Sequence, residues 1–316
     1  MNNNIRISII VLTYKKFDNL QKNINSILSQ NYSNYEVIVS DDGSPDIDVQ
    51  YINSLFPDNA KEKFHLITRN ENIGTVKNYN EAVLQSKGDI IVPLSQDDCF
   101  YNEDVLSIID RSFEDPDTNI CLGVRKTAGK DELLPNQYQC DLISEGNSKK
   151  LWFRNACKNM CYGASLYWRR SFLLNMGLFD EEYRLLEDYP MIMKCIEQGE
   201  HINVISSPTI LWDYNGVSGV RRKTGLLADD QLKFDKSMYE KSKTILNSKV
   251  CKKYMYYKTS YLDNSGFKYK MYRYISVDCI IVYSKLMSHI NKRYLMDYRF
   301  DLLWNLECKA TNKKKA

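Results

Sequence analysis

The sequence predicts an α/β fold with a mostly parallel, doubly wound sheet that helices cover on both faces. Short apolar stretches of strand length recur along the front of the chain, amphipathic helical stripes separate them, and a polar cluster follows each. Strands that are apolar throughout belong to sheets buried on both faces, and their alternation with helices indicates parallel pairing. The 316 residues are 43% hydrophobic and carry a formal charge of +3, which excludes disordered, collagen-like and disulfide-scaffold proteins.

The front elements follow in a regular order. Apolar runs mark the strands, and apolar residues spaced three or four apart mark the helices. We expect strands at Ile5–Thr13, Tyr35–Ser40, Phe64–Thr68 and Asp89–Leu94. Pro93 has no N–H for the sheet, so the fourth should end near it or have a bulge beside it. We expect helices over Leu20–Leu28 and Val76–Leu84.

Beyond Asp98 the pattern loosens. Further helices are expected at Asn102–Phe113 and at Leu186–Gln198, where Gly199 is the stop signal. Further strands are expected at Ile120–Val124, Gly163–Trp168, Ile202–Ile205 and Thr209–Tyr214. Residues Asp131–Lys150 are polar and are expected to form an irregular surface excursion. Helical stripes begin again at Leu226.

Charge divides the chain into two parts. From Gly225 to Ala316 there are 19 Lys+Arg and 9 Asp+Glu, or +10, which leaves −7 for Met1 to Thr224. We therefore expect a front domain over 1–224 and a basic helical extension over 225–316. The basic part either faces an anionic partner, such as phospholipid or a lipid-linked phosphate, or carries solvated helix faces.

The sequence also indicates a location. No apolar run approaches the roughly 20 residues that span a bilayer. The start has no basic region ahead of its first apolar run and no small-residue cleavage site after it, so we expect a cytoplasmic protein. The nine cysteines are scattered, which favours reduced core thiols over a zinc site.

Polar clusters follow the first four predicted strands, and parallel strands should bring these clusters to one crevice. Paired carboxylates occur in two of them, at Asp41–Asp42 and at Asp97–Asp98. Carboxylates with substrate phosphates are ligands for Mg²⁺ or Mn²⁺, whereas an isolated Asp-Asp is common in solvated turns. The glycine-rich phosphate loops of dinucleotide- and ATP-binding proteins are absent, so a metal is expected to hold the phosphates.

Two residues of this crevice suit a nucleotide base. Tyr14 offers a face for stacking, and Asp42 could accept a hydrogen bond from a ring N–H. The alternatives are simple packing for Tyr14 and turn capping for Asp42.

The ordered blocks of the chain resemble the family-two inverting glycosyltransferases, which have the GT-A fold. The resemblance covers about Ile5 to Ser218 and does not reach the tail. It rests on Ile7–Tyr14, Ser26–Gln30, Tyr35–Ser44, Asn72-Ile73-Gly74 with Asn80, Gly88-Asp89, Asp97-Asp98, Glu187-Asp188 and Tyr214–Ser218.

The resemblance implies roles for individual residues. It implies that Tyr14 stacks on the base, that Asp42 contacts it, and that Asp98 holds the metal although Ser95 replaces the first carboxylate of that motif. It implies that Asp188 is the catalytic base and Glu187 its neighbour. The nucleotide-sugar site as a whole is expected to comprise Thr13, Tyr14, Asp41, Asp42, Asn80 and Asp97. Arg221, Arg222 and Lys223 either close over the diphosphate or form a solvated loop.

By the same resemblance, we expect a bacterial inverting glycosyltransferase that depends on Mn²⁺ or Mg²⁺. It would move one sugar from a nucleotide-sugar donor, expected to be a UDP-sugar, to a growing surface glycan such as an O-antigen, capsule or exopolysaccharide. The membrane helices and the Gln-x-x-Arg-Trp motif of processive synthases are missing. The alternatives are a polyprenyl-phosphate glycosyltransferase and a catalytically degenerate sugar-nucleotide binding module.

The tail is expected to meet the inner face of the cytoplasmic membrane. Its basic residues, its tyrosines and Trp304 would hold the enzyme where a lipid-linked acceptor lies. We expect no nucleic-acid partner, and the sequence does not fix the oligomeric state.

The alternative to a catalytic role for Glu187-Asp188 is that the pair only complements the dipole of the helix that it begins.

Overall fold

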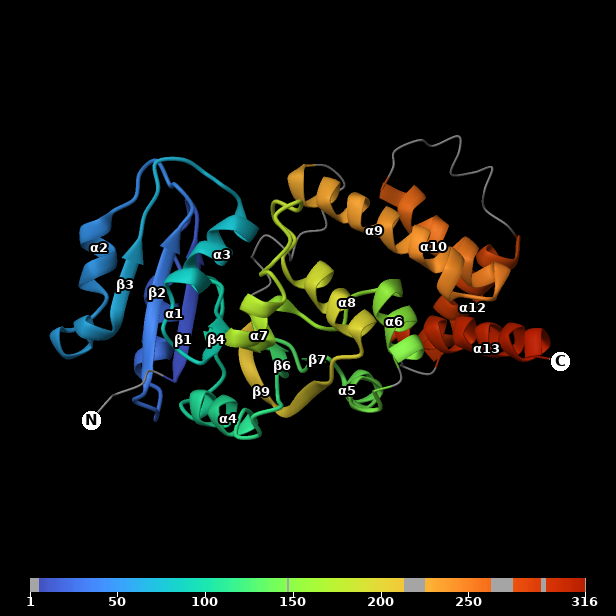
Figure 1. Cartoon of the computed structure of the whole chain (residues 1–316), viewed down its shortest axis with the longest axis horizontal. Helices are drawn as coiled ribbons and strands as arrows, with labels where there is room; N and C mark the ends of the chain where they lie inside the picture. Colours follow the sequence, from blue (N-terminus) through green and yellow to red (C-terminus); the bar gives the residue numbers. More distant parts are fainter. Residues whose placement is uncertain (1–5, 147, 213–224, 263–274, 291–293, 316) are drawn as a thin grey trace. The chain divides into compact units, whose positions relative to one another are not determined.

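The computed structural model describes residues 6–146, 148–212, 225–262, 275–290 and 294–315. They divide into two compact units (Figure 1). The first comprises Met1–Gly146 and Met160–Arg221, and the second comprises Asn147–Asn159 and Arg222–Ala316. The predicted boundary after Thr224 lies at the edge of residues outside the described ranges and stays a prediction.

The first unit is built on one nine-stranded sheet with the order β3-β2-β1-β4-β8-β6-β9-β5, and β7 pairs with β6. The strands are β1 (Ile7–Thr13), β2 (Tyr35–Asp41), β3 (Phe64–Ile67), β4 (Ile90–Pro93), β5 (Cys99–Phe100), β6 (Ile120–Thr127), β7 (Leu133–Leu134), β8 (Leu166–Arg169) and β9 (Ile202–Trp212).

Pairing in the sheet is parallel in the front half and mixed beyond it. β1 pairs parallel with both β2 and β4, and β2 pairs parallel with β3. β8 runs antiparallel to β4 and β6, whereas β6 and β9 are parallel. The four predicted front strands are therefore confirmed, and β4 ends at Pro93 as expected. Their carboxyl ends lie at one edge, where the polar clusters follow.

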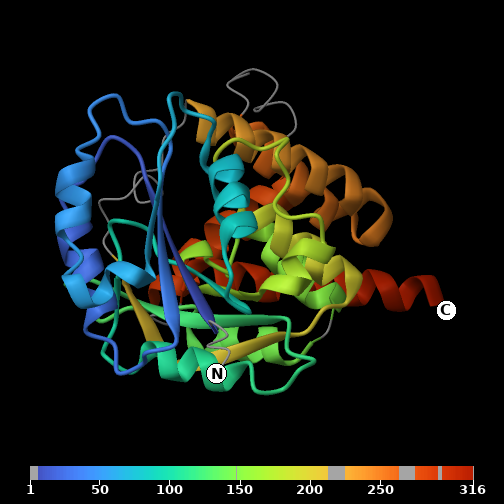
Figure 2. The same cartoon turned by 60° about the vertical axis from the view of Figure 1, so that its left-hand side comes forward.

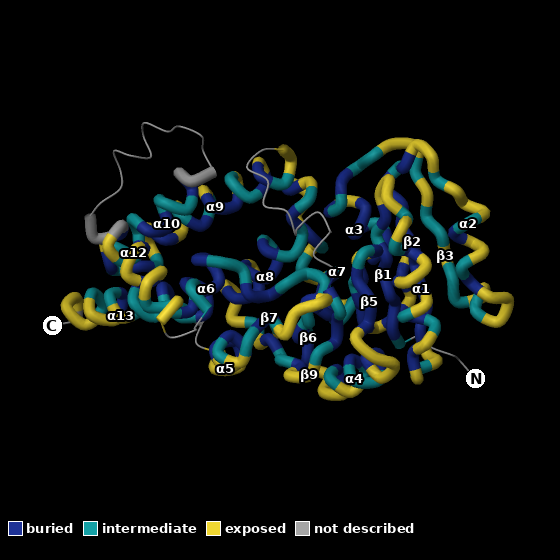
Figure 3. The backbone as a smooth tube through the Cα atoms, turned by 180° about the vertical axis from the view of Figure 1, so that it is seen from behind, coloured by how far each residue is buried: buried dark blue, intermediate teal, exposed yellow. Residues whose placement is uncertain are grey.

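Helices cover both faces of the front sheet, as predicted. Alternate residues of β1, among them Ile7 and Ile9, pack with buried residues of α1, α2 and α4, whereas α3 lies against β1 and β2. Figure 2 shows α2 and α3 on opposite sides of the sheet, and Figure 3 shows the strands as the buried centre. The bounds are α1 (Leu20–Leu28), α2 (Val49–Ser54), α3 (Thr75–Gln85) and α4 (Val105–Ser112).

The remaining helices of this unit are α5 (Gln137–Ser144), α7 (Arg170–Asn175) and α8 (Asp188–Gln198). Short 3₁₀ turns, η1 (Asp58–Lys63) and η2 (Gly163–Ser165), precede β3 and β8. α8 ends at Gly199, whose φ of 79° is the left-handed conformation expected of a glycine stop. The predicted helix over Leu186–Gln198 is thus confirmed, with its start at Asp188.

The expectation of an irregular excursion over 131–150 is wrong. That range contains β7, α5 and the start of α6 (Ser148–Cys157). A capping box begins α5: the Asn136 side chain accepts from the Gln139 N–H, and the Gln139 side chain accepts from the Asn136 N–H. Leu142 and Ile143 are then buried, so a polar composition conceals a short amphipathic helix.

Two strand predictions also need correction. The expected pair of strands at Ile202–Ile205 and Thr209–Tyr214 is one strand, β9, which continues through Pro208 because its pairing with β6 shifts register around Val124. Tyr214 lies outside the described residues. The strand expected from Gly163 starts instead at Leu166, because Gly163–Ser165 form a 3₁₀ turn.

The second unit is helical, as predicted for the tail. It consists of α6 with α9 (Leu226–Ile245), α10 (Lys249–Leu262), α12 (Ile275–Ile290) and α13 (Leu295–Lys315). Buried Arg154 of α6 donates to buried Asp297 of α13 at 2.6 Å, which desolvates both charges together. None of the helices that the structure describes is long and apolar enough to cross a bilayer.

Candidate active site

Asp41, at the end of β2, closes the turn that follows the strand. Its carboxylate accepts from the Thr13 hydroxyl at 3.0 Å, and from the Ser44 backbone N–H and hydroxyl at 2.7 Å each. Gly43 has a φ of 72°, and a side chain there would collide with the backbone of Glu71. The structure thus brings Thr13 and Asp41 together and gives them a shared role in shaping this turn.

Asp42, the next residue, ties the end of β2 to the loop that leads into α3. Its buried carboxylate accepts from the Asn72 side chain at 2.7 Å and from the N–H groups of Ile73 and Gly74 at 2.8 and 3.1 Å. Burial raises the pKa of Asp42, and the two backbone hydrogen bonds oppose that rise. Because a carboxylate has about four acceptor positions, about one is left for a ligand N–H.

Tyr14 projects past the end of β1 with 38% of its surface exposed. The chain turns sharply after it: Lys15 has a φ of 61°, and its N–H donates to the Ser44 hydroxyl at 2.7 Å. The Lys15 ammonium lies 4.8 Å from the centre of the Tyr14 ring. The ring is therefore accessible to a stacking partner, beside the turn that Asp41 closes.

Asn80 of α3 is hydrogen-bonded to the loop before α8. Its Nδ2 donates to the Phe179 carbonyl at 2.9 Å and to Glu181 at 3.0 Å, and its Oδ1 accepts from the Phe179 N–H at 3.0 Å. Both amide hydrogens are thus already bonded within the protein. The structure gives Asn80 a scaffold role, and its predicted contact with the nucleotide stays a prediction.

Asp97 and Asp98 follow β4 in a turn that is fastened to α1. Asn23 of α1 donates to the carbonyls of Ser95 and Asp98 at 2.9 and 2.8 Å, and the Asp98 N–H donates to the Ser95 carbonyl at 2.9 Å. The Asp97 carboxylate accepts from Asn19 at 3.2 Å. Asp98 is 3% exposed, so the surrounding protein fixes its position.

The carboxylates of Asp97 and Asp98 determine how a metal ion could bind at this turn. Among the described residues there is no group of three or more His, Cys, Asp or Glu side chains that could enclose an ion. Mg²⁺ and Mn²⁺ are hard cations that commonly bind through one or two carboxylates and complete their coordination with substrate phosphates and water. Asp98, with Asp97 beside it, fits that mode, in which the ion arrives with a diphosphate.

Asp188 begins α8 and is held by backbone donors from two directions. Its Oδ2 accepts from the Gly163 N–H at 2.9 Å, and its Oδ1 accepts from the Tyr189 N–H at 2.6 Å. Burial raises the pKa of Asp188, and these hydrogen bonds and the charge of Arg125 oppose the rise. The carboxylate is therefore fixed in orientation and more basic than an exposed aspartate.

Glu187 is the neutral partner of this pair at pH 7. Burial and, secondarily, the charge of Asp188 raise the pKa of Glu187 to about 8. Burial raises the pKa of the Tyr79 hydroxyl well above its ordinary value, and Glu187 raises it further once that carboxyl group is ionised. Two adjacent buried carboxyl groups thus carry one charge near neutrality, and the stronger hydrogen-bonding places it on Asp188.

The sequence reasoning did not identify Arg125, which a bulge in the sheet aims toward these groups. The pairing of β6 with β9 slips on both sides of Val124, and Gly123 allows this because a Cβ there would lie 2.1 Å from the Thr209 hydroxyl. Burial lowers the pKa of Arg125, while the charges of Tyr162, Asp98 and Asp188 oppose that shift. Asp98 and Asp188, 90 positions apart in sequence, thus act on one guanidinium.

The loops connect the rest of the predicted site. The Asn72–Gly74 loop that holds Asp42 also contacts Arg184, whose guanidinium donates to the Asn72 side chain at 2.7 Å. Arg184 precedes the Glu187–Asp188 pair on the same loop. The predicted block Tyr214–Ser218 and the cations at 221–223 lie outside the described residues.

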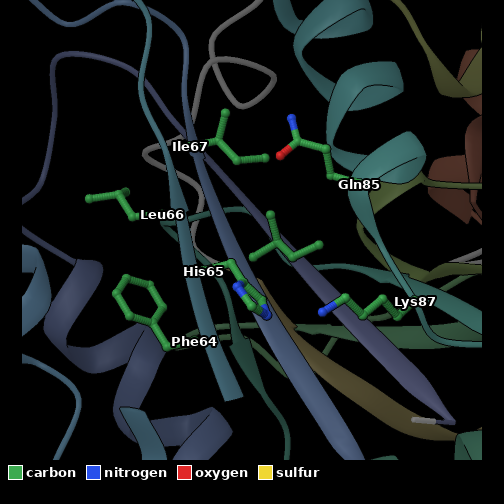
Figure 4. A pocket seen from close by; sticks show the side chains of 7 residues that line it. Phe64, His65, Leu66, Ile67, Gln85 and Lys87 are labelled. Carbon is green, nitrogen blue, oxygen red and sulfur yellow. The ribbon is translucent and has the colours of Figure 1, made fainter. Parts of the chain in front are cut away.

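A separate groove of about 350 Å³ lies where β3 begins and just ahead of β4 (Figure 4). It is lined by Ile38, Phe64, His65, Leu66, Ile67, Gln85 and Lys87. Beneath it the buried Glu36 carboxylate accepts from the Ser8 hydroxyl and the Lys87 N–H at 2.6 Å each. The groove contains none of the predicted site residues, which follow the strand ends.

Comparison with protein families identifies the family of the chain. The family model described as glycosyl transferase family 2 matches residues 8–174, more than half of the chain. The chain belongs to glycosyl transferase family 2. The matched segment contains nearly all of β1, then β2 through β8 and most of α7, and it includes Asp42, Asp98 and Arg125.

Two curated relatives match parts of this family-2 chain. An uncharacterized glycosyltransferase of Haemophilus influenzae is 26% identical over 193 residues, which are 61% of this chain and 62% of the relative. A Campylobacter jejuni enzyme named GalNAc(5)-diNAcBac-PP-undecaprenol beta-1,3-glucosyltransferase is 33% identical over 93 residues, which are 29% of this chain and 30% of that one. The chain thus spans less than two thirds of either relative.

Solved structures support the GT-A fold. S. aureus TarS 1-349 in complex with UDP-GlcNAc matches with a TM-score of 0.56 at 17% identity, covering 84% of this chain and 73% of that one. The mannosyltransferase PcManGT from Pyrobaculum calidifontis, in complex with GDP-Man and Mn²⁺, matches with a TM-score of 0.58 at 14% identity, covering 93% and 84%. The predicted GT-A core with C-terminal helices is confirmed.

Proposed function

We propose that this family-2 chain is an inverting glycosyltransferase that moves one hexose from a UDP-sugar to a hydroxyl of a growing, lipid-linked bacterial surface glycan. The observation that carries the proposal is the fixed, buried Asp188 carboxylate, which shares the Arg125 guanidinium with Asp98. An inverting transfer requires a base for the acceptor hydroxyl and a group for the leaving diphosphate, here a carboxylate that would hold a divalent ion. UDP-GlcNAc in one structural neighbour supports a UDP-sugar donor.

In this proposal Asp188 takes the proton of the acceptor hydroxyl as its oxygen attacks the anomeric carbon. The hydrogen bonds from Gly163 and Tyr189 orient the accepting oxygens. Glu187 stays protonated near pH 7 and so keeps the pair at one negative charge beside the leaving diphosphate. Because attack comes from the side opposite the leaving diphosphate, the configuration at the anomeric carbon inverts.

The donor would lie across the strand ends. Tyr14 stacks on the base, the remaining acceptor position of Asp42 takes a ring N–H, and the turn formed by Thr13 and Asp41 supports both. Asp98, with Asp97 beside it, would hold Mn²⁺ or Mg²⁺ together with the diphosphate. Such an ion supplies Lewis acidity that stabilises negative charge on the leaving group.

We further propose that residues 1–224 form the catalytic part and that 225–316 form an extension that contacts an anionic membrane from the cytoplasmic side. Trp304 was expected to make this contact, but its ring packs against Phe153 and Phe300 at 6.1 Å in each case. The outer face of α12 is the better candidate. It exposes four large apolar side chains on successive turns, Val282, Tyr283, Leu286 and Ile290, with exposed Lys285 between them.

A membrane-binding surface would bring the enzyme to a lipid-linked acceptor. The name of the Campylobacter jejuni relative includes such an acceptor, a glycan on PP-undecaprenol. The extension has a balance of +10, and anionic lipids attract basic segments by about 1 kcal/mol for each Lys or Arg near the surface.

Two measurements test the catalytic proposal. A thermal-shift screen of UDP- and GDP-sugars with Mn²⁺ should raise the unfolding temperature most with one UDP-sugar. Proton NMR of the transfer or hydrolysis product at early time should then give the β anomer from an α-linked donor. A retained α anomer would contradict the inverting mechanism, and no shift with any nucleotide sugar would contradict donor binding.

A further inference from the structure

The Arg125 side chain is clamped between two aromatic rings. The centre of its guanidinium lies 3.7 Å from the Tyr162 ring centre and 4.1 Å from the Trp212 ring centre. Stacking of this kind stabilises the cation and fixes the plane of the group. With two rings against the guanidinium, its edge N–H groups are the part best able to bind a further partner.

Those edge donors have no partner within the described part of the protein. The Arg125 side chain forms no hydrogen bond or ion pair with the described residues, and its Nε is buried without a partner. A buried donor left unpaired costs roughly 1–3 kcal/mol, and more when it is charged. The clamp therefore holds a cation ready for a ligand that the folded chain does not supply.

Three carboxylates lie near enough to act on the Arg125 guanidinium, those of Asp98, Asp188 and Glu132. Two of them, Asp98 and Asp188, are predicted site residues. The segment that carries Tyr162 also carries Gly163, the backbone donor to Asp188. The Arg125 guanidinium is thus near both Asp188, the proposed base, and Asp98, beside which the leaving group is proposed to lie.

We propose that Arg125 is an oxyanion-binding residue of the reaction centre and that its edge N–H groups bind a phosphate. The planar edge of a guanidinium matches the paired oxygens of a phosphate, whereas a sugar hydroxyl leaves its charge uncompensated. The phosphate belongs either to the donor diphosphate or to an anionic acceptor. This inference rests on the proposed function for the identity of the donor, but binding tests it without turnover.

The test is calorimetry on the full chain with Mg²⁺ in a phosphate-free buffer. One arm titrates UDP, with uridine as the ligand that lacks phosphate. The second arm titrates inorganic phosphate into protein saturated with UDP. The variants are Arg125→Gln, which removes the charge, and Arg125→Lys, which keeps a charge but removes the planar edge. Exposed Arg111 of α4 offers the matched control, Arg111→Gln.

We expect Arg125→Gln to weaken binding at least tenfold in one arm while uridine affinity is unchanged, and Arg125→Lys to recover it only in part. A loss in the UDP arm assigns the donor diphosphate, and a loss in the phosphate arm assigns the acceptor side. Affinities within threefold of the wild type in both arms would overturn the inference. A wild-type chain that binds no UDP would instead contradict the proposed function. Should Arg125→Gln fail to fold, Arg125→Lys must still weaken one arm severalfold.

Discussion

The backbone N–H of Gly163 donates to Oδ2 of Asp188 at 2.9 Å, and the space beside Gly163 is tight. A Cβ on residue 163 would lie 3.1 Å from Cβ of Asp188 and 3.2 Å from both Asp188 Oδ2 and Glu187 Oε1. A side chain at this position would therefore press on the carboxyl pair and displace it by a few tenths of an ångström. This contact couples the sheet to the start of α8.

Replacing Gly163 with alanine should displace Asp188 without removing it. Because the new methyl group presses on the carboxylate, we expect kcat to fall about tenfold or more, since small misplacements of catalytic groups are costly. The affinity for UDP should stay within twofold of the wild type. The measurement is steady-state turnover beside calorimetry with UDP. Unchanged kcat would show that the close contact does not orient the base.

Glu187 should give the enzyme a characteristic response to alkaline pH. The pKa of Glu187 is about 8, so above that pH a second negative charge appears beside Asp188 and the diphosphate. We expect turnover to decline above about pH 8 in the wild type and to stay level in Glu187→Gln, whose amide does not ionise. The pH profile of kcat from 6 to 10 measures this. Identical alkaline limbs in the two proteins would contradict it.

Glu187 should also make the free energy of unfolding depend on pH in a defined direction. Folding raises the pKa of Glu187 from 4.5 to about 8, so the folded state holds the proton more tightly than the unfolded chain. The resulting stabilisation is complete below pH 4.5 and is lost as pH rises to about 8. Urea unfolding at several pH values should therefore show the wild type losing stability relative to Glu187→Gln across this window. A constant difference would count against the buried, neutral carboxyl.

Asp98 should account for the effect of divalent metal on donor binding. With Mn²⁺ present, UDP should bind the wild type at least tenfold more tightly than in EDTA, whereas Asp98→Ala should bind it equally in both. Exposed Asp58→Asn is the control. Ser95 stands where the family motif has its first carboxylate, so a wild type that ignores Mn²⁺ and releases no nucleotide would favour a degenerate binding module.

The outer face of α12 should direct membrane binding. We expect the wild-type chain to float with vesicles that contain phosphatidylglycerol and to remain below vesicles of phosphatidylcholine alone. The double variant Leu286→Glu with Ile290→Glu should lose flotation, because it places two charges among the exposed apolar side chains. Leu84→Glu changes an equally exposed leucine of α3 and should float normally. Flotation of the double variant would exclude α12 as the contact.

The front of the fold could be predicted because local patterns there agree with the final structure. β1 is a nearly continuous apolar run and β2 has Val37–Val39 at its centre, and sheets that bury both faces need such strands. α5 was missed because its amphipathic pattern is short, although Asn136 and Gln139 carry a capping-box signal. The second half of the sheet mixes directions, and nothing in a single strand reports the direction of its neighbour.

The candidate site was predictable only where chemistry lies in adjacent residues. Asp41–Asp42, Asp97–Asp98 and Glu187–Asp188 are visible as pairs in the sequence. Arg125 is not, because its role depends on a bulge opposite β9 and on Tyr162 and Trp212, which are distant in the chain. The hydrogen bonds of Asn80 to Phe179 depend equally on tertiary contacts.

The central claim is that Asp188 is the proton acceptor, and turnover of Asp188→Asn tests it most directly. The amide keeps the size of the side chain but cannot accept the proton, and general-base catalysis contributes about 10²–10⁴-fold. We predict a fall in kcat of that order with UDP affinity within a few-fold of the wild type. Turnover of Asp188→Asn equal to that of the wild type would contradict the account.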